Sequence, residues 1–89
     1  MDELEESFKN AVQLVNERKL KNTPNDNELS NLYKYFKQAT IGDINISCPL
    51  LDLKGRTKWF AWDSIKGMSA KEAKEKYIET VLELFEKYN

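Results

Sequence analysis

Apolar residues recur every three or four positions through much of the chain, which is the spacing of one face of an α-helix. The first run, through Leu4, Phe8 and Val12, predicts a helix over residues 3–16. The acidic residues at its start suit the positive end of a helix dipole. We expect this apolar stripe to lie in the core, and Phe8 is also a candidate for lining a groove.

The periodicity is lost over residues 17–25, which end in Thr-Pro-Asn and predict a loop. Apolar residues then return at steps of three and four and predict a second helix over residues 26–41, which Gly42 ends. The residues of this helix that we expect to hold the bundle together are Leu29, Leu32 and Thr40.

Residues 43–53 are apolar but irregular, and Pro49 excludes a continuous helix there. We expect this connection to pack over the body of the domain, because its isoleucines and leucines would otherwise expose a large apolar surface. A third helix is predicted from near Asp52 to Lys66, with Gly67 as its stop.

The start of the fourth helix is the most sharply predicted boundary in the chain. Ser69 and Glu72 have the spacing of a capping box, and Met68 with Ala73 fits the accompanying hydrophobic staple. Apolar residues continue at helical spacing to the end of the sequence. Since no strand pattern competes anywhere, the predicted fold class is all-α with four helices.

Composition limits the chemistry that this chain can perform. Its 89 residues predict one domain, spanning 1–89, with a modest core. Cys48 is the only cysteine and histidine is absent, which excludes an internal disulfide, a Cys/His zinc site and a histidine-activated nucleophile. No apolar run has the length of a membrane span and no signal-peptide pattern opens the sequence, so we expect a reducing, cytoplasmic location.

Positive charge is concentrated in the middle of the chain. Residues 34–58 contain five basic residues against two acidic ones, while the whole chain has a net charge of −1. Nucleic-acid-binding proteins neutralise many phosphates with a broad basic surface, so we expect no nucleic acid as a partner. A compact anion suits the local surplus better.

Aromatic rings and lysines on the second and third helices are the candidate binding residues. Tyr33, Phe36 and Lys37 share one face of a helix. Lys58 lies four residues before Trp62, so we expect its ammonium group to lie against the indole rings, although at least one tryptophan should anchor the core. Ammonium groups bond to phosphate oxygens and rings stack on a purine, so this set predicts a nucleotide-phosphate site.

These observations alone leave several functions open. The apolar helix faces are either ordinary core or a groove for an amphiphile beside the polar rim. The aromatic face is alternatively a docking surface for a partner helix, as in a protein-interaction module. Enzymatic catalysis has the least support, because Asp and Glu would have to supply all the acid and base chemistry and no glycine-rich phosphate loop is present.

Three segments, YKYFKQATIGD, KWFAW and GMSAKEA, occur in this order, and with them the chain closely resembles the acyl-CoA-binding protein family over essentially its whole length. The resemblance implies an up-down-down-up four-helix bundle. It also implies a monomeric carrier and pool-former for medium and long-chain acyl-CoA esters in lipid transport and fatty acid metabolism, without catalysis or a cofactor. Transient contact with acyl-CoA-using enzymes or membranes is a further expectation.

The resemblance also implies which residues bind the ligand. In the family, a tyrosine and a lysine of the second helix, a lysine before the tryptophan pair and a tyrosine of the last helix meet the adenine and 3′-phosphate of CoA. The acyl-CoA-binding residues implied in this sequence are Tyr33, Lys34, Tyr35, Phe36, Lys37, Lys54, Lys58, Tyr77, Phe8 and Arg18.

Two positions depart from the family pattern. Phe36 stands where the family commonly has tyrosine, which keeps a ring for stacking but removes a hydroxyl group. Asn16 falls where many members have a lysine that contacts the ligand, ahead of a slightly longer first loop. We expect Arg18 or Lys19 to substitute for that lysine.

Overall fold

The computed structural model describes residues 2–17 and 24–88, and these residues form four α-helices and no strand. The helices are α1 (Glu3–Asn16), α2 (Asp26–Thr40), α3 (Leu53–Asp63) and α4 (Ala70–Tyr88). The predicted all-α fold class is confirmed, and the first helix has the predicted bounds. Arg18 and Lys19 lie outside the described residues. In the described part of the chain, no helix combines the length and apolarity needed to cross a membrane.

Each helix begins at a side chain that accepts a hydrogen bond from the first turn, which satisfies an amide that has no partner within the helix. The predicted cap of α4 is confirmed, because the Glu72 amide donates to the Ser69 hydroxyl over 3.0 Å. A full capping box between Asn25 and Glu28 starts α2. The caps of α1 and α3 are Asp2 and Asp52.

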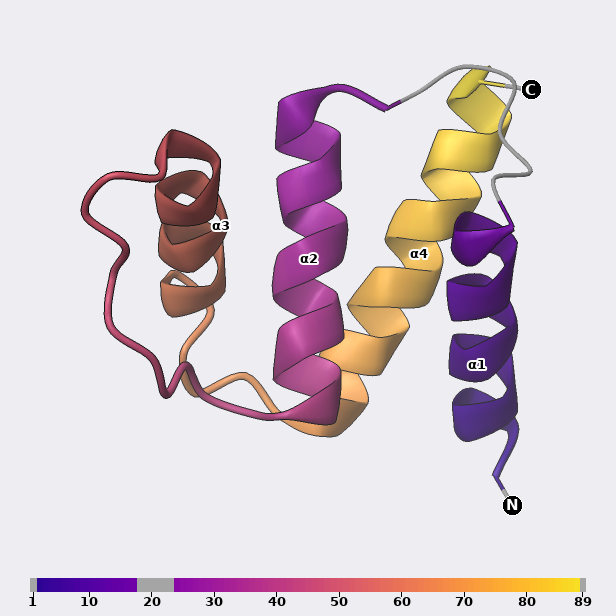
Figure 1. Ribbon diagram of the computed structural model, residues 1–89. Helices are drawn as coiled ribbons and strands as arrows, with labels where there is room; N and C mark the ends of the chain where they lie inside the picture. Colours follow the sequence, from indigo (N-terminus) through magenta and orange to yellow (C-terminus); the bar gives the residue numbers. More distant parts are fainter. Residues whose placement is uncertain (1, 18–23, 89) are drawn as a thin grey trace.

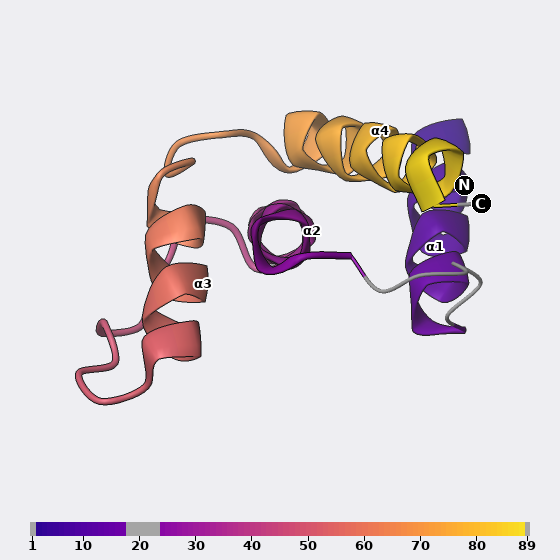
Figure 2. The same ribbon diagram turned by 90° about the horizontal axis from the view of Figure 1, so that it is seen from above.

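Figure 1 shows α1 and α4 running up the page and α2 and α3 running down, which is the predicted up-down-down-up order. α2 packs against both α3 and α4, whereas α1 packs against α4. Seen along α2 in Figure 2, α3 lies on one side of it and α4 and α1 lie on the other. The molecule is therefore a thin slab of 35 × 32 × 17 Å with α3 at one edge.

The core lies where α1, α2 and α4 meet, and an aromatic triad occupies it. The ring centroid of Phe8 is 6.2 Å from that of Phe36 and 5.2 Å from that of Tyr77. Phe8 is only 5% exposed, so it belongs to the core. The buried aliphatic residues around the triad are Ala11, Leu32, Ala39, Ala73, Val81 and Leu84.

α3 ends at Asp63, so the prediction that it continues to Lys66 is wrong. The Lys66 amide donates to the Asp63 carbonyl over 3.2 Å, a bond to the third residue back, which marks a tighter turn than an α-helix. Gly67 follows with a φ of +96°, and its amide donates to the Asp43 carboxylate over 2.7 Å. This tertiary bond turns the chain away from the helix axis earlier than the local sequence indicates.

The prediction that residues 43–53 pack over the body of the domain is wrong for their leucines. The exposed fractions are 80% for Leu50, 98% for Leu51 and 80% for Leu53. The Trp59 indole donates to the Ile46 carbonyl over 2.7 Å, and the Arg56 guanidinium donates to the Pro49 carbonyl over 3.3 Å. Backbone carbonyls therefore attach this connection to α3, and the leucine side chains face outward.

Of the three residues expected to hold the second helix in the bundle, only Leu32 is buried. Leu29 is 40% exposed, and Thr40 is exposed with its hydroxyl donating to the Phe36 carbonyl of the same helix. Helical spacing predicts which residues share a face, but not how far a neighbouring helix covers that face. The prediction that at least one tryptophan anchors the core is confirmed, because Trp62 is 1% exposed.

Candidate functional site

Two lysines from different helices converge on one tyrosine ring. The Lys37 ammonium lies 5.7 Å from the ring centroid of Tyr33, and the Lys58 ammonium lies 5.5 Å from the same centroid. Both distances are within the range of a cation–π contact. α2 supplies Tyr33 and Lys37 four residues apart on one face, and α3 supplies Lys58. The fold thus brings together three of the residues predicted to bind a phosphorylated ligand.

The lysine that meets the buried indole is different from the one predicted. Lys37, not Lys58, has its ammonium over Trp62, at 5.8 Å from the ring centroid. The Trp62 ring stands edge-on to Tyr33, with centroids 6.3 Å apart and planes at 82°. Because α3 turns Trp62 toward α2, a lysine on α2 reaches the indole and Lys58 reaches the tyrosine.

A buried polar network determines where α3 sits beside α2. The amide nitrogen of Gln38 donates to Asp43 over 2.9 Å and to the Met68 carbonyl over 2.8 Å. The Trp62 indole donates to the Gln38 amide oxygen over 3.2 Å and to the Gly42 carbonyl over 2.9 Å. The bonds that Asp43 accepts from the Gly67 amide and from Gln38 lower the pKa of its carboxyl group. These motif residues therefore position the site, a role that sequence reasoning did not assign to them.

A pocket of about 180 Å³ lies between α2 and α3. Its lining residues are Asp26, Leu29 and Ser30 from α2 and Lys54, Thr57 and Lys58 from α3. Lys58 belongs both to this pocket and to the group around Tyr33, so the pocket and the basic aromatic group are continuous. Leu29 is partly exposed because it faces this pocket and not a neighbouring helix.

Phe36 and Tyr77, predicted to face the ligand with Tyr33, belong to the aromatic triad in the core. Their ring centroids lie 6.2 Å apart, and Tyr77 is 4% exposed. Burial raises the pKa of the Tyr77 hydroxyl to about 12. Phe36 is half-buried and packs against the core. It lies on α2, the helix that also carries Tyr33 and Lys37.

Lys34 and Tyr35 pair with each other, with the ammonium 5.0 Å from the ring centroid. Tyr35 is two residues from Tyr33, so it points to the opposite side of α2, where it packs against the core. The fold does not bring this pair to the Tyr33 ring. Arg18, the remaining predicted ligand residue, lies outside the described part of the chain.

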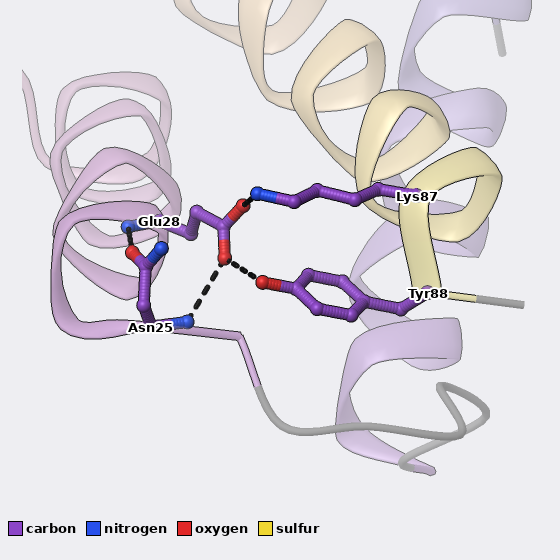
Figure 3. Close-up of polar contacts among 4 residues, drawn as sticks. All are labelled: Asn25, Glu28, Lys87 and Tyr88. Atoms are coloured by element: carbon purple, nitrogen blue, oxygen red, sulfur yellow. Dashed lines mark hydrogen bonds and ion pairs between the residues drawn. The ribbon is translucent and has the colours of Figure 1, made fainter.

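Figure 3 shows a cluster that sequence reasoning missed, at the start of α2 and the end of α4. The Glu28 carboxylate forms an ion pair of 2.8 Å with Lys87, and it accepts hydrogen bonds from the Tyr88 hydroxyl and the Asn25 amide. The bonds from Lys87, Tyr88 and Asn25 lower the pKa of Glu28 to about 2. Asn25 and Glu28 have the spacing of a capping box, so the sequence could have predicted that these two residues start a helix. No feature of the local sequence predicts that Glu28 also contacts α4.

The site therefore defines a class: a small helical domain in which two ammonium groups and an aromatic ring adjoin a pocket between two helices, as suits an anionic ligand with a flat group. The chain belongs to the acyl-CoA-binding protein family. Residues 5–81 match the family model described as Acyl CoA binding protein.

Individual relatives agree with this assignment. The chain is 47% identical over 85 residues to a Hypsibius protein named as a candidate acyl-CoA-binding protein, and the match covers 94% of this chain and 93% of that protein. The fold is similar to the crystal structure of Oryza sativa Acyl-CoA-Binding Protein 2, with a TM-score of 0.83 and 34% sequence identity. That match covers 94% of this chain and 92% of the rice chain. It is also similar to the crystal structure of ACBP from Moniliophthora perniciosa, with a TM-score of 0.84 and 43% sequence identity. This second match covers 98% of this chain and 83% of the Moniliophthora chain.

Proposed function

We propose that this chain binds acyl-CoA esters and carries them within the cell as a pool available to lipid metabolism. The observation that carries the proposal is the Tyr33 ring with the Lys37 and Lys58 ammonium groups beside it. In the proposal the two lysines form charge-assisted bonds to the 3′-phosphate of CoA, and aromatic rings of α2 stack on its adenine. Family membership supports the same ligand.

The pocket between α2 and α3 would take the apolar part of the ligand, with Leu29 on its wall. Each methylene removed from water contributes ~0.8 kcal/mol, so the tail supplies affinity while the phosphates supply orientation. We therefore expect medium and long acyl chains to bind more tightly than short ones. CoA without a chain should bind much more weakly.

The other ligand contacts in the proposal come from the family resemblance. Phe36 and Tyr77 are expected at the nucleotide, where Phe36 offers a ring without the hydroxyl of the common family residue. Lys54 is expected to approach the ligand from the pocket that it lines. The remaining residues carried over in this way are Lys34, Tyr35, Phe8 and Arg18.

We also propose that the chain is a single acyl-CoA-binding domain that acts as a cytoplasmic monomer. It would carry its ligand without catalysis or a bound cofactor, and meet acyl-CoA-using enzymes or membranes only transiently. The family is one of binding and carrier proteins, which supports a non-enzymatic role.

Calorimetric titration with a long-chain acyl-CoA tests the proposal directly. We expect a one-to-one complex of submicromolar affinity. Lys37→Ala and Lys58→Ala should each weaken binding roughly ten- to a hundredfold, because each removes a charge-assisted hydrogen bond of about 1.5–3 kcal/mol.

The matched control is Lys71→Ala, which removes an exposed lysine at the start of α4. We expect its affinity to equal that of the wild type. Absence of binding heat with the wild-type protein, or equal losses in all three lysine variants, would contradict the proposed site.

A further inference from the structure

A serine hydroxyl group in the pocket between α2 and α3 has no hydrogen-bond partner. Ser30 lines this pocket and is only 9% exposed. Within residues 2–17 and 24–88, its hydroxyl group forms no hydrogen bond. Every fully enclosed side-chain oxygen and nitrogen of these residues has a partner, so the Ser30 hydroxyl group is not fully enclosed. The open space beside it is the pocket, where a ligand could reach it.

Threonine hydroxyl groups on the same helices are already bonded to the backbone. Thr40, Thr57 and Thr80 each donate to the carbonyl four residues back, over 2.8, 3.1 and 2.7 Å. This is a common local way to satisfy a hydroxyl group within a helix. Thr57 lines the same pocket as Ser30, but its hydroxyl proton is taken by the Leu53 carbonyl. Ser30 therefore has the hydroxyl group that is available to a ligand in this pocket.

Ser30 lies on the face of α2 that carries the candidate nucleotide contact. Asp26, Ser30 and Tyr33 are four and three residues apart, which places them along one side of the helix. Across the pocket, α3 presents Lys54 and Lys58, whose hydrocarbon stems are apolar. The pocket wall thus combines apolar surface with oxygen-bearing side chains, at the place where the proposed function puts the acyl chain.

The pocket has room for part of an acyl chain. Its volume of about 180 Å³ is far larger than the roughly 10–15 Å³ that one water molecule needs. An unsubstituted chain in the pocket would displace water from the Ser30 hydroxyl group without replacing the hydrogen bond. A buried hydroxyl group without a partner is unfavourable, whereas a chain that carries an oxygen atom at this point restores the bond.

We propose that Ser30 makes this protein prefer acyl-CoA esters with a hydroxyl group on the chain over unsubstituted esters of the same length. A hydroxyl group on the chain can accept a hydrogen bond from Ser30 and donate one to a carboxylate such as that of Asp26, one turn earlier on α2. The inference rests on the proposed function, because it specifies the chemistry of the chain that the same site takes. Ser30 is a specificity-determining residue in this proposal.

Two other ligand groups fit the pocket less well. A carboxylate at the end of the chain would suit Lys54 and Lys58, but it would lie against the Asp26 carboxylate with no proton to donate. The thioester carbonyl that all acyl-CoA esters share could accept from Ser30, but it also has no proton for Asp26. A hydroxyl group on the chain serves both side chains.

Calorimetric titration with matched ligands tests the preference. The ligands are hexadecanoyl-CoA and hydroxyhexadecanoyl-CoA isomers with the hydroxyl group next to the thioester, at mid-chain or at the chain end. We expect the wild-type protein to bind at least one isomer about three- to tenfold more tightly than hexadecanoyl-CoA, as one additional neutral hydrogen bond would give. Equal or weaker binding of every isomer would overturn the inference and leave the carrier function intact.

The decisive variant is Ser30→Ala, which removes the hydroxyl group and keeps a residue that favours a helix. We expect this variant to lose the preference, so that the favoured isomer and hexadecanoyl-CoA bind within about twofold of each other. The matched control is Ser7→Ala, at an exposed position of α1, which should keep the wild-type preference. A preference that Ser30→Ala retains would show that another group recognises the hydroxyl and would overturn the inference.

The same titrations separate this inference from the carrier function. If Ser30→Ala weakens the binding of all the ligands by the same factor, Ser30 binds a group that they share, such as the thioester carbonyl, and the inference is overturned while the carrier function stands. If the wild-type protein binds none of the ligands, the carrier function is overturned and this inference with it.

Discussion

At the scale of single residues, Gln38 shows how a buried polar side chain can determine the position of a helix. Its side chain is 1% exposed, and its amide group forms hydrogen bonds with Asp43, Met68 and Trp62, which belong to three different parts of the chain. The Gln38 amide is therefore satisfied only when α3 and the turn before α4 are in place. In the sequence it reads as one polar residue within a motif.

Replacing Gln38 by alanine should destabilise the protein by about 1–3 kcal/mol, because the buried Trp62 indole loses an acceptor and the Met68 carbonyl loses a donor. Urea unfolding followed by circular dichroism measures this change. Gln13→Ala, at an exposed position of α1, is the control and should change stability by less than about 0.5 kcal/mol. Equal stabilities of the two variants would refute the importance of this network.

At the scale of elements, Glu28 joins the start of α2 to the end of α4. It closes the capping box of α2 and also binds Lys87 and Tyr88, so one carboxylate satisfies groups on two helices (Figure 3). At the other end of α4, Lys74 forms an ion pair with Glu5 of α1. α4 is thus tied to its neighbours near both ends, in addition to its buried apolar face.

The stability that Glu28 contributes should depend on pH in a defined window. Its pKa is about 2 in the folded protein against an ordinary value of 4.5, so the unfolded chain binds the proton more readily. The contribution is complete above pH 4.5 and is lost as the pH falls from 4.5 toward 2. Thermal unfolding between these values measures the loss.

Glu28→Gln should lower the thermal unfolding midpoint at neutral pH, and it should remove part of the loss of stability that occurs below pH 4.5. Glu86→Gln, at an exposed position in the last turns of α4, is the matched control and should follow the wild-type curve. If the stability of the Glu28 variant fell below pH 4.5 as steeply as that of the wild type, the Glu28 carboxylate would not be the source of the pH dependence.

At the scale of the whole molecule, the buried core lies on one side of α2 and α3 lies on the other. α1, α2 and α4 enclose the aromatic core, whereas α3 packs only against α2 among the helices. The candidate site spans this weaker boundary, with Tyr33 and Lys37 on α2 and Lys58 on α3. A ligand bound there would connect α3 to the rest of the molecule.

Amide hydrogen exchange should therefore be faster in α3 than in the buried parts of α2 and α4, because α3 has fewer packed neighbours. Long-chain acyl-CoA at about 100 times its dissociation constant should slow exchange in α3 by up to ~100-fold. Mass spectrometry of peptic fragments measures both effects. Exchange in α3 that the ligand leaves unchanged, under conditions where calorimetry shows binding, would place the ligand elsewhere.

Much of the fold could be predicted locally. The bounds of α1, the Ser69 cap of α4 and the all-α class follow from apolar spacing and capping residues, since both act within one or two turns of a helix. The motifs around Tyr33, Lys58 and Gly67 indicated the family that the comparisons then showed.

By itself, then, the sequence determined the helices, their caps, the family and the residue types available to a ligand. Only the tertiary structure decided that Lys58 meets Tyr33, that Leu29 faces a pocket, that Glu28 reaches α4 and that Leu50 and Leu51 are exposed. These outcomes depend on how helices rotate and cross, and on bonds between residues distant in the chain. Helical periodicity specifies a face of each helix, but it does not specify what that face will meet.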